Sequence, residues 1–266
     1  DNGFMTDWSL QAVEELVKRF GVEHTVLKPP AQKLAGIYRR SLQLTGAPCM
    51  GCAYAMYAST IRCAQELGIP LAVHGRARNQ MFRFLSPTSN DAFTEFIYDG
   101  LKPLEDTDPH STLTRVRERA IANLPPALVD EVLEFFPDVN CSEPVEFVPF
   151  FLYHPYNEYE IIDYIERNCA WSKPEDEQHA LFAHYDCLAH DAAHYLYQLA
   201  ETRPHILPEL SVLVREGQLS KEEAEAELCK NIFKEAPNES LGQLSEVSGM
   251  SKEDMISIAV QHGKKF

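Results

Sequence analysis

The first 75 residues alternate between helical and strand-like segments, and this alternation limits the fold more than any other feature of the sequence. Residues 7–20 and 31–44 place apolar side chains at helical spacing. The stretches VEHTVL (22–27) and GIPLAVHG (68–75) are short, apolar and bounded by turn residues, as strands are. Helices that alternate with such strands predict a parallel sheet, and therefore an α/β domain.

The rest of the chain is predicted to be helical, with one further strand. VEFVPFFLY (145–153) has strand character, and residues 157–168 form an amphipathic helix that begins with a capping asparagine. Residues 91–140 combine helical patterns with several prolines, which indicates a helical insertion or lid. We therefore expect an α/β domain at 1–170, including this insertion, and a helical C-terminal region at 171–266.

The composition counts against several classes of protein. Hydrophobic residues make up 45% of the 266 residues and charged residues 24%, as in an ordinary globular protein. The net charge of −16 counts against nucleic acid and anionic membranes as main partners, because both are bound through basic surfaces. No apolar run approaches the roughly 20 residues of a membrane span, and the start lacks signal-peptide character, so we expect a cytoplasmic protein.

The stretch PCMGC contains the close pair among the seven cysteines, Cys49 and Cys52. An odd number of cysteines at irregular spacing does not predict a disulfide framework. The pair can be two ligands of a metal or iron–sulfur site, two incidental core thiols, or a redox pair. The first two interpretations fit equally well, whereas the helix and Gly-Ala-Pro turn before the pair disfavour a thioredoxin-like redox motif.

A metal site would need a further ligand from elsewhere in the chain. In HYDCLAHDAAHYLY (184–197), a helix would bring Cys187, His190 and His194 to one face at i, i+3 and i+7. That face could hold zinc by itself or complete a site with the cysteine pair, and ordinary exposed or core histidines are the alternative. The second choices for a third cysteine ligand are Cys141 and Cys169.

Basic and polar residues follow the predicted strand that ends near residue 73. Ligands collect at the carboxyl ends of parallel strands, and arginine is well suited to bind phosphate. We therefore prefer a contact with a phosphorylated ligand over a solvated loop for these residues, which are His74, Gly75, Arg76, Arg78 and Gln80. Arg215, in the stretch VREGQLS, is a further binding candidate, although a plain connection between helices also explains that stretch.

Four stretches together resemble the PP-loop ATP pyrophosphatase superfamily, nearest its N-acetyl sugar amidotransferase-like and iron–sulfur-dependent sulfurtransferase branches. In chain order they are DNGFMTD, APCMGCAYAMYASTIRCAQELGIPLAVHGRARNQ, YHPYNEYEIIDYIE, and FAHYDCLAHDAAHYL with VLVREGQLSKEEA. The resemblance implies a parallel-sheet α/β domain of the PP-loop (HUP-like) type, with a helical lid and a helical C-terminal region. The SGGxDS loop that defines the family is not in the sequence, so we expect the domain to be N-terminally incomplete.

The resemblance also implies a chemistry. ATP and Mg²⁺ would bind at the strand ends, a substrate oxygen would be activated as an adenylate, and a nucleophile would then displace AMP. In the sulfur-transferring relatives three cysteines hold a [4Fe–4S] cluster, which here would be Cys49, Cys52 and Cys187. An amidotransferase subunit with a glutaminase partner and a structural Zn²⁺ stays open, as does a non-catalytic binding domain.

The expected partners follow from the same resemblance and from the charge. The acceptor would be a small molecule, such as a sugar, rather than tRNA, because the chain is acidic. A sulfur donor or a glutaminase would supply the nucleophile, and a homodimer is left open.

Overall fold

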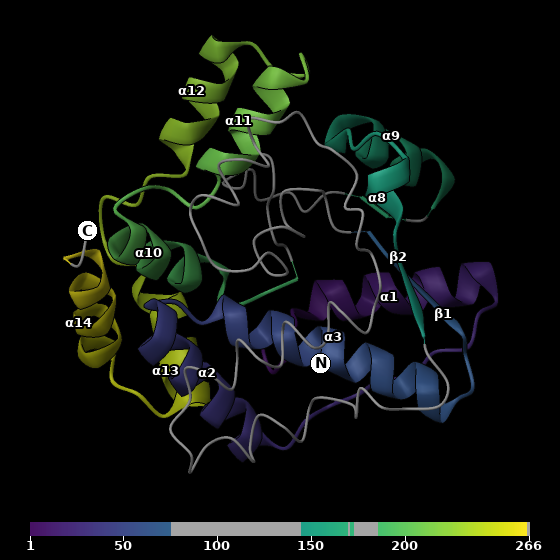
Figure 1. Ribbon diagram of the computed structural model, residues 1–266, viewed down its shortest axis with the longest axis horizontal. Coiled ribbons are helices and arrows are strands. Elements are labelled where there is room, and N and C mark those ends of the chain that lie inside the picture. Colours follow the sequence, from purple (N-terminus) through teal and green to yellow (C-terminus); the bar gives the residue numbers. More distant parts are fainter. Residues whose placement is uncertain (76–144, 170, 173–185, 265–266) are drawn as a thin grey trace. The chain divides into compact units, whose positions relative to one another are not determined.

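The computed structural model describes residues 1–75, 145–169, 171–172 and 186–264 (Figure 1). These residues are mostly helical, and they include two short strands that pair in parallel. The chain divides into two compact units, which we call the helical unit (1–48 and 157–266) and the strand unit (49–156). The predicted domains 1–170 and 171–266 are a different division and stay a prediction. The predicted lid at 91–140 lies outside the described residues.

The helical unit has a core formed by four of its helices. Its helices are α1 (Asp7–Phe20), α2 (Ala31–Thr45), α9 (Glu158–Asn168), α10 (His190–Glu201), α11 (Leu207–Arg215), α12 (Lys221–Lys230), α13 (Asn238–Ser248) and α14 (Lys252–Gly263). Helix α10 packs against α13 and α14, and α2 packs against the same two helices. The side chains that are completely buried in this unit include Leu42, Leu196, Leu241, Leu244 and Met255. Burying each one stabilises the fold by about 1.5–3 kcal/mol.

Capping residues set the ends of these helices. Four N-cap side chains accept a hydrogen bond from a backbone N–H in the first turn: Thr6, Asn157, Ser220 and Ser251. Ser220 and Glu223 also form a complete capping box. The helices predicted at 7–20, 31–44 and 157–168 are confirmed within a residue or two at their ends.

Gly46 ends α2 and could not be another residue without strain. Its φ of 75° lies in the left-handed region, and its N–H donates to the carbonyl oxygen of Leu42. A Cβ at this position would lie 2.6 Å from the Cβ of Ala200 in α10. The glycine therefore serves both the turn and the close approach of α2 to α10.

The strand predicted at 22–27 is wrong: residues 22–30 form neither helix nor strand. Val22 and Val26 are 55% and 60% exposed. A β-branched run becomes a strand only when a neighbouring strand takes up its backbone hydrogen bonds. The carbonyl oxygen of Leu27 instead accepts from the backbone nitrogen of Asp1, at 2.6 Å.

The described residues of the strand unit are 49–75 and 145–156. Its elements are α3 (Cys49–Glu66), β1 (Leu71–His74), β2 (Glu146–Pro149) and α8 (Phe150–Tyr153). The strands pair in parallel, with Leu71 opposite Glu146 and His74 opposite Pro149. The strand predicted at 145–153 is therefore half right: the chain turns helical at Phe150, after a proline that has no N–H for a sheet ladder. The larger parallel sheet of a PP-loop domain stays a prediction.

Candidate functional site

Cys49 and Cys52 lie in the first turn of α3, which begins at Cys49. Residues at i and i+3 of a helix share one face. Both thiols are partly exposed, and no disulfide joins any of the six cysteines that the structure describes. Two thiols at this spacing can bind one ion or cluster. Helix α2 and a short turn precede α3, rather than the strand that a thioredoxin-like redox motif requires.

Cys187 lies in the helical unit, among turn residues that precede α10. It forms an isolated antiparallel bridge with Met5. On either side of the bridge, the N–H of Thr6 donates to the carbonyl of Asp186 at 3.2 Å, and the N–H of Leu188 donates to that of Phe4 at 2.8 Å. The predicted helical face of Cys187, His190 and His194 is therefore wrong at Cys187, because backbone pairing with Met5 holds that residue outside the helix.

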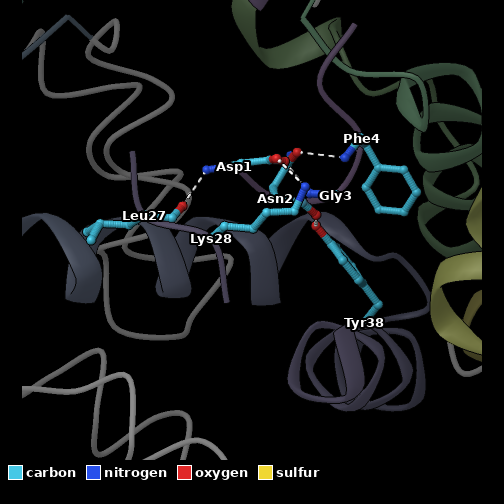
Figure 2. Close-up of polar contacts among 7 residues, drawn as sticks. All are labelled: Asp1, Asn2, Gly3, Phe4, Leu27, Lys28 and Tyr38. Atoms are coloured by element: carbon cyan, nitrogen blue, oxygen red, sulfur yellow. Dashed lines mark hydrogen bonds and ion pairs between the residues drawn. The ribbon is translucent and has the colours of Figure 1, made fainter. Parts of the chain in front are cut away.

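The segment that pairs with Cys187 is itself held firmly on α2 (Figure 2). The side chain of Asp1 accepts from the N–H of Gly3 at 2.8 Å, and that of Asn2 accepts from the N–H of Phe4 at 3.0 Å. The hydroxyl of Tyr38 donates to the carbonyl of Asn2 at 2.8 Å, and the Phe4 and Tyr38 rings lie 5.0 Å apart. Phe4 is 2% exposed. Residues of DNGFMTD thus meet Asp186 and Cys187, which belong to another of the stretches that carry the family resemblance.

Three histidine rings meet in the helical unit: His190 and His194 of α10, and His205 after that helix. The ring centroids of His190 and His194 are 4.0 Å apart, and those of His194 and His205 are 4.3 Å apart and nearly parallel. His194 is buried at 6% exposure. The helical spacing of the first two rings was visible in the sequence. His205 was missed, because it lies in the connection between α10 and α11, which no periodic pattern links to the helix.

Ser240 of α13 holds the start of α10 in place. Its hydroxyl donates to the carbonyl of Leu188 at 2.8 Å and accepts from the N–H of Ala192 at 3.0 Å. Ser240 is 8% exposed, and its hydrogen bond with Ala192 is buried. The segment that carries Cys187 is thereby fixed on both sides, by Met5 and by α13.

The predicted metal ligands are spread over both units. In the described parts of the chain, no group of three or more His, Cys, Asp or Glu side chains is arranged to hold a metal ion. Cys49 and Cys52 belong to the strand unit and Cys187 to the helical unit, so a site that joins the three stays a prediction. Of the second choices, Cys169 is buried after α9, and Cys141 lies outside the described residues.

The carboxyl ends of β1 and β2 carry the described part of the predicted nucleotide site. His74 ends β1 opposite Pro149, and Gly75 follows it. A Cβ on Gly75 would lie 3.7 Å from the ring of Phe151, so the backbone after β1 passes close to α8. Arg76, Arg78 and Gln80 lie outside the described residues.

Arg215, the remaining predicted contact, ends α11 in the helical unit and is exposed. Its Nε donates to the carbonyl of Ser211 at 3.2 Å, within the same helix. This contact stabilises the end of α11, and a role for Arg215 in ligand binding stays a prediction.

No protein-family model matches the chain, and no match is found among curated proteins. The family resemblance therefore rests on the four stretches and their order. None of the helices in the described ranges combines the length and apolar character that a membrane-spanning helix requires.

Proposed function

We propose that the protein is an ATP-dependent adenylating enzyme of the PP-loop type that transfers sulfur with the help of a [4Fe–4S] cluster. The observation that carries the proposal is the placement of Cys49 and Cys52 in one helical turn at the start of α3. That helix contacts β1, which ends at His74. A paired thiol site and a strand end, where α/β proteins bind ligands, are thus successive elements of one unit.

The fold that we propose around these elements is the parallel sheet of a PP-loop (HUP-like) domain, with β1 and β2 as two of its strands. ATP and Mg²⁺ would bind at the strand ends. The candidate contacts are His74, Gly75, Arg76, Arg78, Gln80 and Arg215. Arginine side chains would neutralise the charge that develops on the phosphates as pyrophosphate leaves.

The proposed reaction has two steps. A substrate oxygen attacks the α-phosphorus of ATP and pyrophosphate leaves, which forms an adenylate. A sulfur nucleophile then attacks the activated carbon, and the carbon–oxygen bond breaks with AMP as the leaving group. AMP leaves far more readily than hydroxide, which is the physical reason for spending ATP.

The cysteines fit a cluster as far as their chemistry goes. Cys49 and Cys52 are partly exposed thiols on one helix face, and Cys187 is a partly exposed thiol in a fixed segment. When bound, the cluster would supply the sulfur-transfer chemistry, because three cysteine ligands leave one iron open. Two thiols also suit zinc, so the amidotransferase alternative makes a different prediction about the metal.

Metal and sulfide analysis of protein purified without oxygen tests this proposal. We expect a brown protein with iron and acid-labile sulfide, and loss of both in Cys49→Ser. Cys63→Ser is the matched control, because Cys63 is a partly exposed thiol further along α3. Cys187→Ser should also lower the iron content.

Other outcomes separate the alternatives. A colourless protein with stoichiometric zinc would overturn the cluster and favour the amidotransferase. If Cys49→Ser has the same metal content as the unaltered protein, these cysteines do not form a metal site. Release of pyrophosphate from ATP distinguishes both enzymes from a non-catalytic binding domain, which would release none.

A further inference from the structure

A group of aromatic rings lies at the carboxyl ends of β1 and β2, and we call it the aromatic edge (Phe150, Phe151, His154 and Tyr156). The rings of Phe150 and His154 are stacked, with centroids 5.3 Å apart and planes 17° apart. Phe151 meets Phe150 edge to face at 5.1 Å, and Tyr156 meets Phe151 in the same way at 4.9 Å. Each ring therefore limits the rotation of its neighbour, which keeps the stacked pair in a fixed orientation.

The stacked pair is open to ligands. Phe150 is 46% exposed and His154 is exposed, although phenylalanine is among the side chains most often found in protein interiors. The Nδ1 of His154 lies 3.0 Å from the carbonyl oxygen of Pro155, which fixes the ring on its own backbone. A flat, exposed and restrained aromatic surface is what proteins use to stack a nucleobase.

The charge around the aromatic edge suits an anionic ligand. The chain contains 40 acidic residues, yet residues 67–75 and 147–157 include none. These two segments form β1, most of β2 and the aromatic edge. His74 and His154 are the titratable nitrogen groups within them. In a protein of net charge −16, these two segments themselves contribute no negative charge that would repel phosphates, although Glu146 begins β2 and Glu158 follows the second segment.

We propose that the aromatic edge binds the base of an adenine nucleotide, with the ring stacked on the Phe150–His154 pair and its phosphates over the acid-free strand ends. The proposal rests on the proposed function for the identity of the nucleotide. It assigns a binding role to Phe150 and His154. Neither the cysteine pair nor the predicted phosphate contacts imply that role.

Equilibrium binding of ATP and of inorganic tripolyphosphate to the intact chain tests this inference. Phe150→Leu should weaken ATP binding about tenfold or more, because a base loses its stacking partner, and should leave tripolyphosphate binding unchanged. Phe150→Tyr keeps an aromatic face and should bind ATP as the unaltered protein does. Phe20→Leu is the matched control, since Phe20 is 62% exposed at the end of α1.

The outcomes separate this inference from the proposed function. If Phe150→Leu and the unaltered protein bind ATP equally, the aromatic edge is not the base site, while the enzyme proposal stands. If ATP binding depends on Phe150 but no pyrophosphate is released, the base site stands and the enzyme proposal fails. If Phe150→Tyr loses as much affinity as Phe150→Leu, stacking is not the cause and the inference fails.

Discussion

The helical unit and the strand unit bury their apolar side chains to different degrees. In the helical unit, Leu196 and Leu244 are completely buried between α10, α13 and neighbouring helices. In the strand unit, Leu71 and Val73 of β1 are 45% and 58% exposed, although parallel strands are normally covered on both faces. A helix satisfies its backbone alone and needs only a packing face, whereas a strand depends on its neighbours. Among the described residues, the completely buried large apolar side chains therefore lie in the helical unit, whereas β1 of the strand unit exposes its apolar side chains.

A buried substitution in the helical unit and an exposed one in the strand unit test the difference in burial. Leu244→Ala removes a completely buried side chain and should lower the free energy of unfolding by about 2–5 kcal/mol. Val73→Ala, in exposed β1, should change it by less than about 0.5 kcal/mol. Urea denaturation followed by circular dichroism measures both. Equal losses in the two variants would contradict the contrast in burial.

Two glycines of the helical unit sharpen the comparison, because they differ in packing and not in backbone. Gly21 and Gly46 both end helices in the left-handed region, with φ of 61° and 75°. Gly21→Ala meets no atom within 4 Å and should cost only the backbone strain, about 1–2 kcal/mol. Gly46→Ala should cost a further 1–3 kcal/mol or so, because its Cβ would collide with Ala200. Thermal unfolding measures the stability of both variants. An equal loss of stability in the two would show that α2 and α10 do not approach so closely at Gly46.

The capping box of α12 should give the smallest effect. Ser220→Ala removes the hydroxyl that caps the helix and should cost roughly 1 kcal/mol at neutral pH. The backbone N–H of Ser220, and then its hydroxyl, lower the pKa of the Glu223 carboxyl below its usual 4.5. A lowered pKa stabilises the folded state above about pH 4.5, and this contribution is lost as the pH falls through the folded value.

Ser220→Ala keeps the backbone N–H and removes the smaller, hydroxyl contribution to the lowered pKa, so it should lose slightly less stability than the unaltered protein when the pH is lowered from neutral to below 4.5. Denaturation curves at several pH values measure the difference. Ser257→Ala is a suitable control, because Ser257 is exposed on α14 and caps no helix. A pH dependence that is the same in all three proteins would show that the Ser220 hydroxyl does not contribute to the lowered pKa of Glu223.

Local sequence determined the parts of this protein that depend on neighbours a few residues away. The ends of α1, α9 and α12 follow Thr6, Asn157 and Ser220, because a capping side chain bonds to a backbone N–H of its own first turn. The i, i+3 spacing places Cys49 and Cys52 on one face of α3, because the helix begins at Cys49 and includes both.

Tertiary structure alone decided what depends on distant partners. Cys187 makes a backbone bridge with Met5, and the ring of His205 lies against that of His194 because the chain turns back after α10. Residues 22–27 have strand composition but no described strand beside them, and their side chains are left in solvent. Strand pairing and ring contacts are made between segments far apart in sequence, and no spacing within a segment reports them. The helices were therefore predictable, whereas the surroundings of Cys187 and the aromatic edge at the strand ends were not.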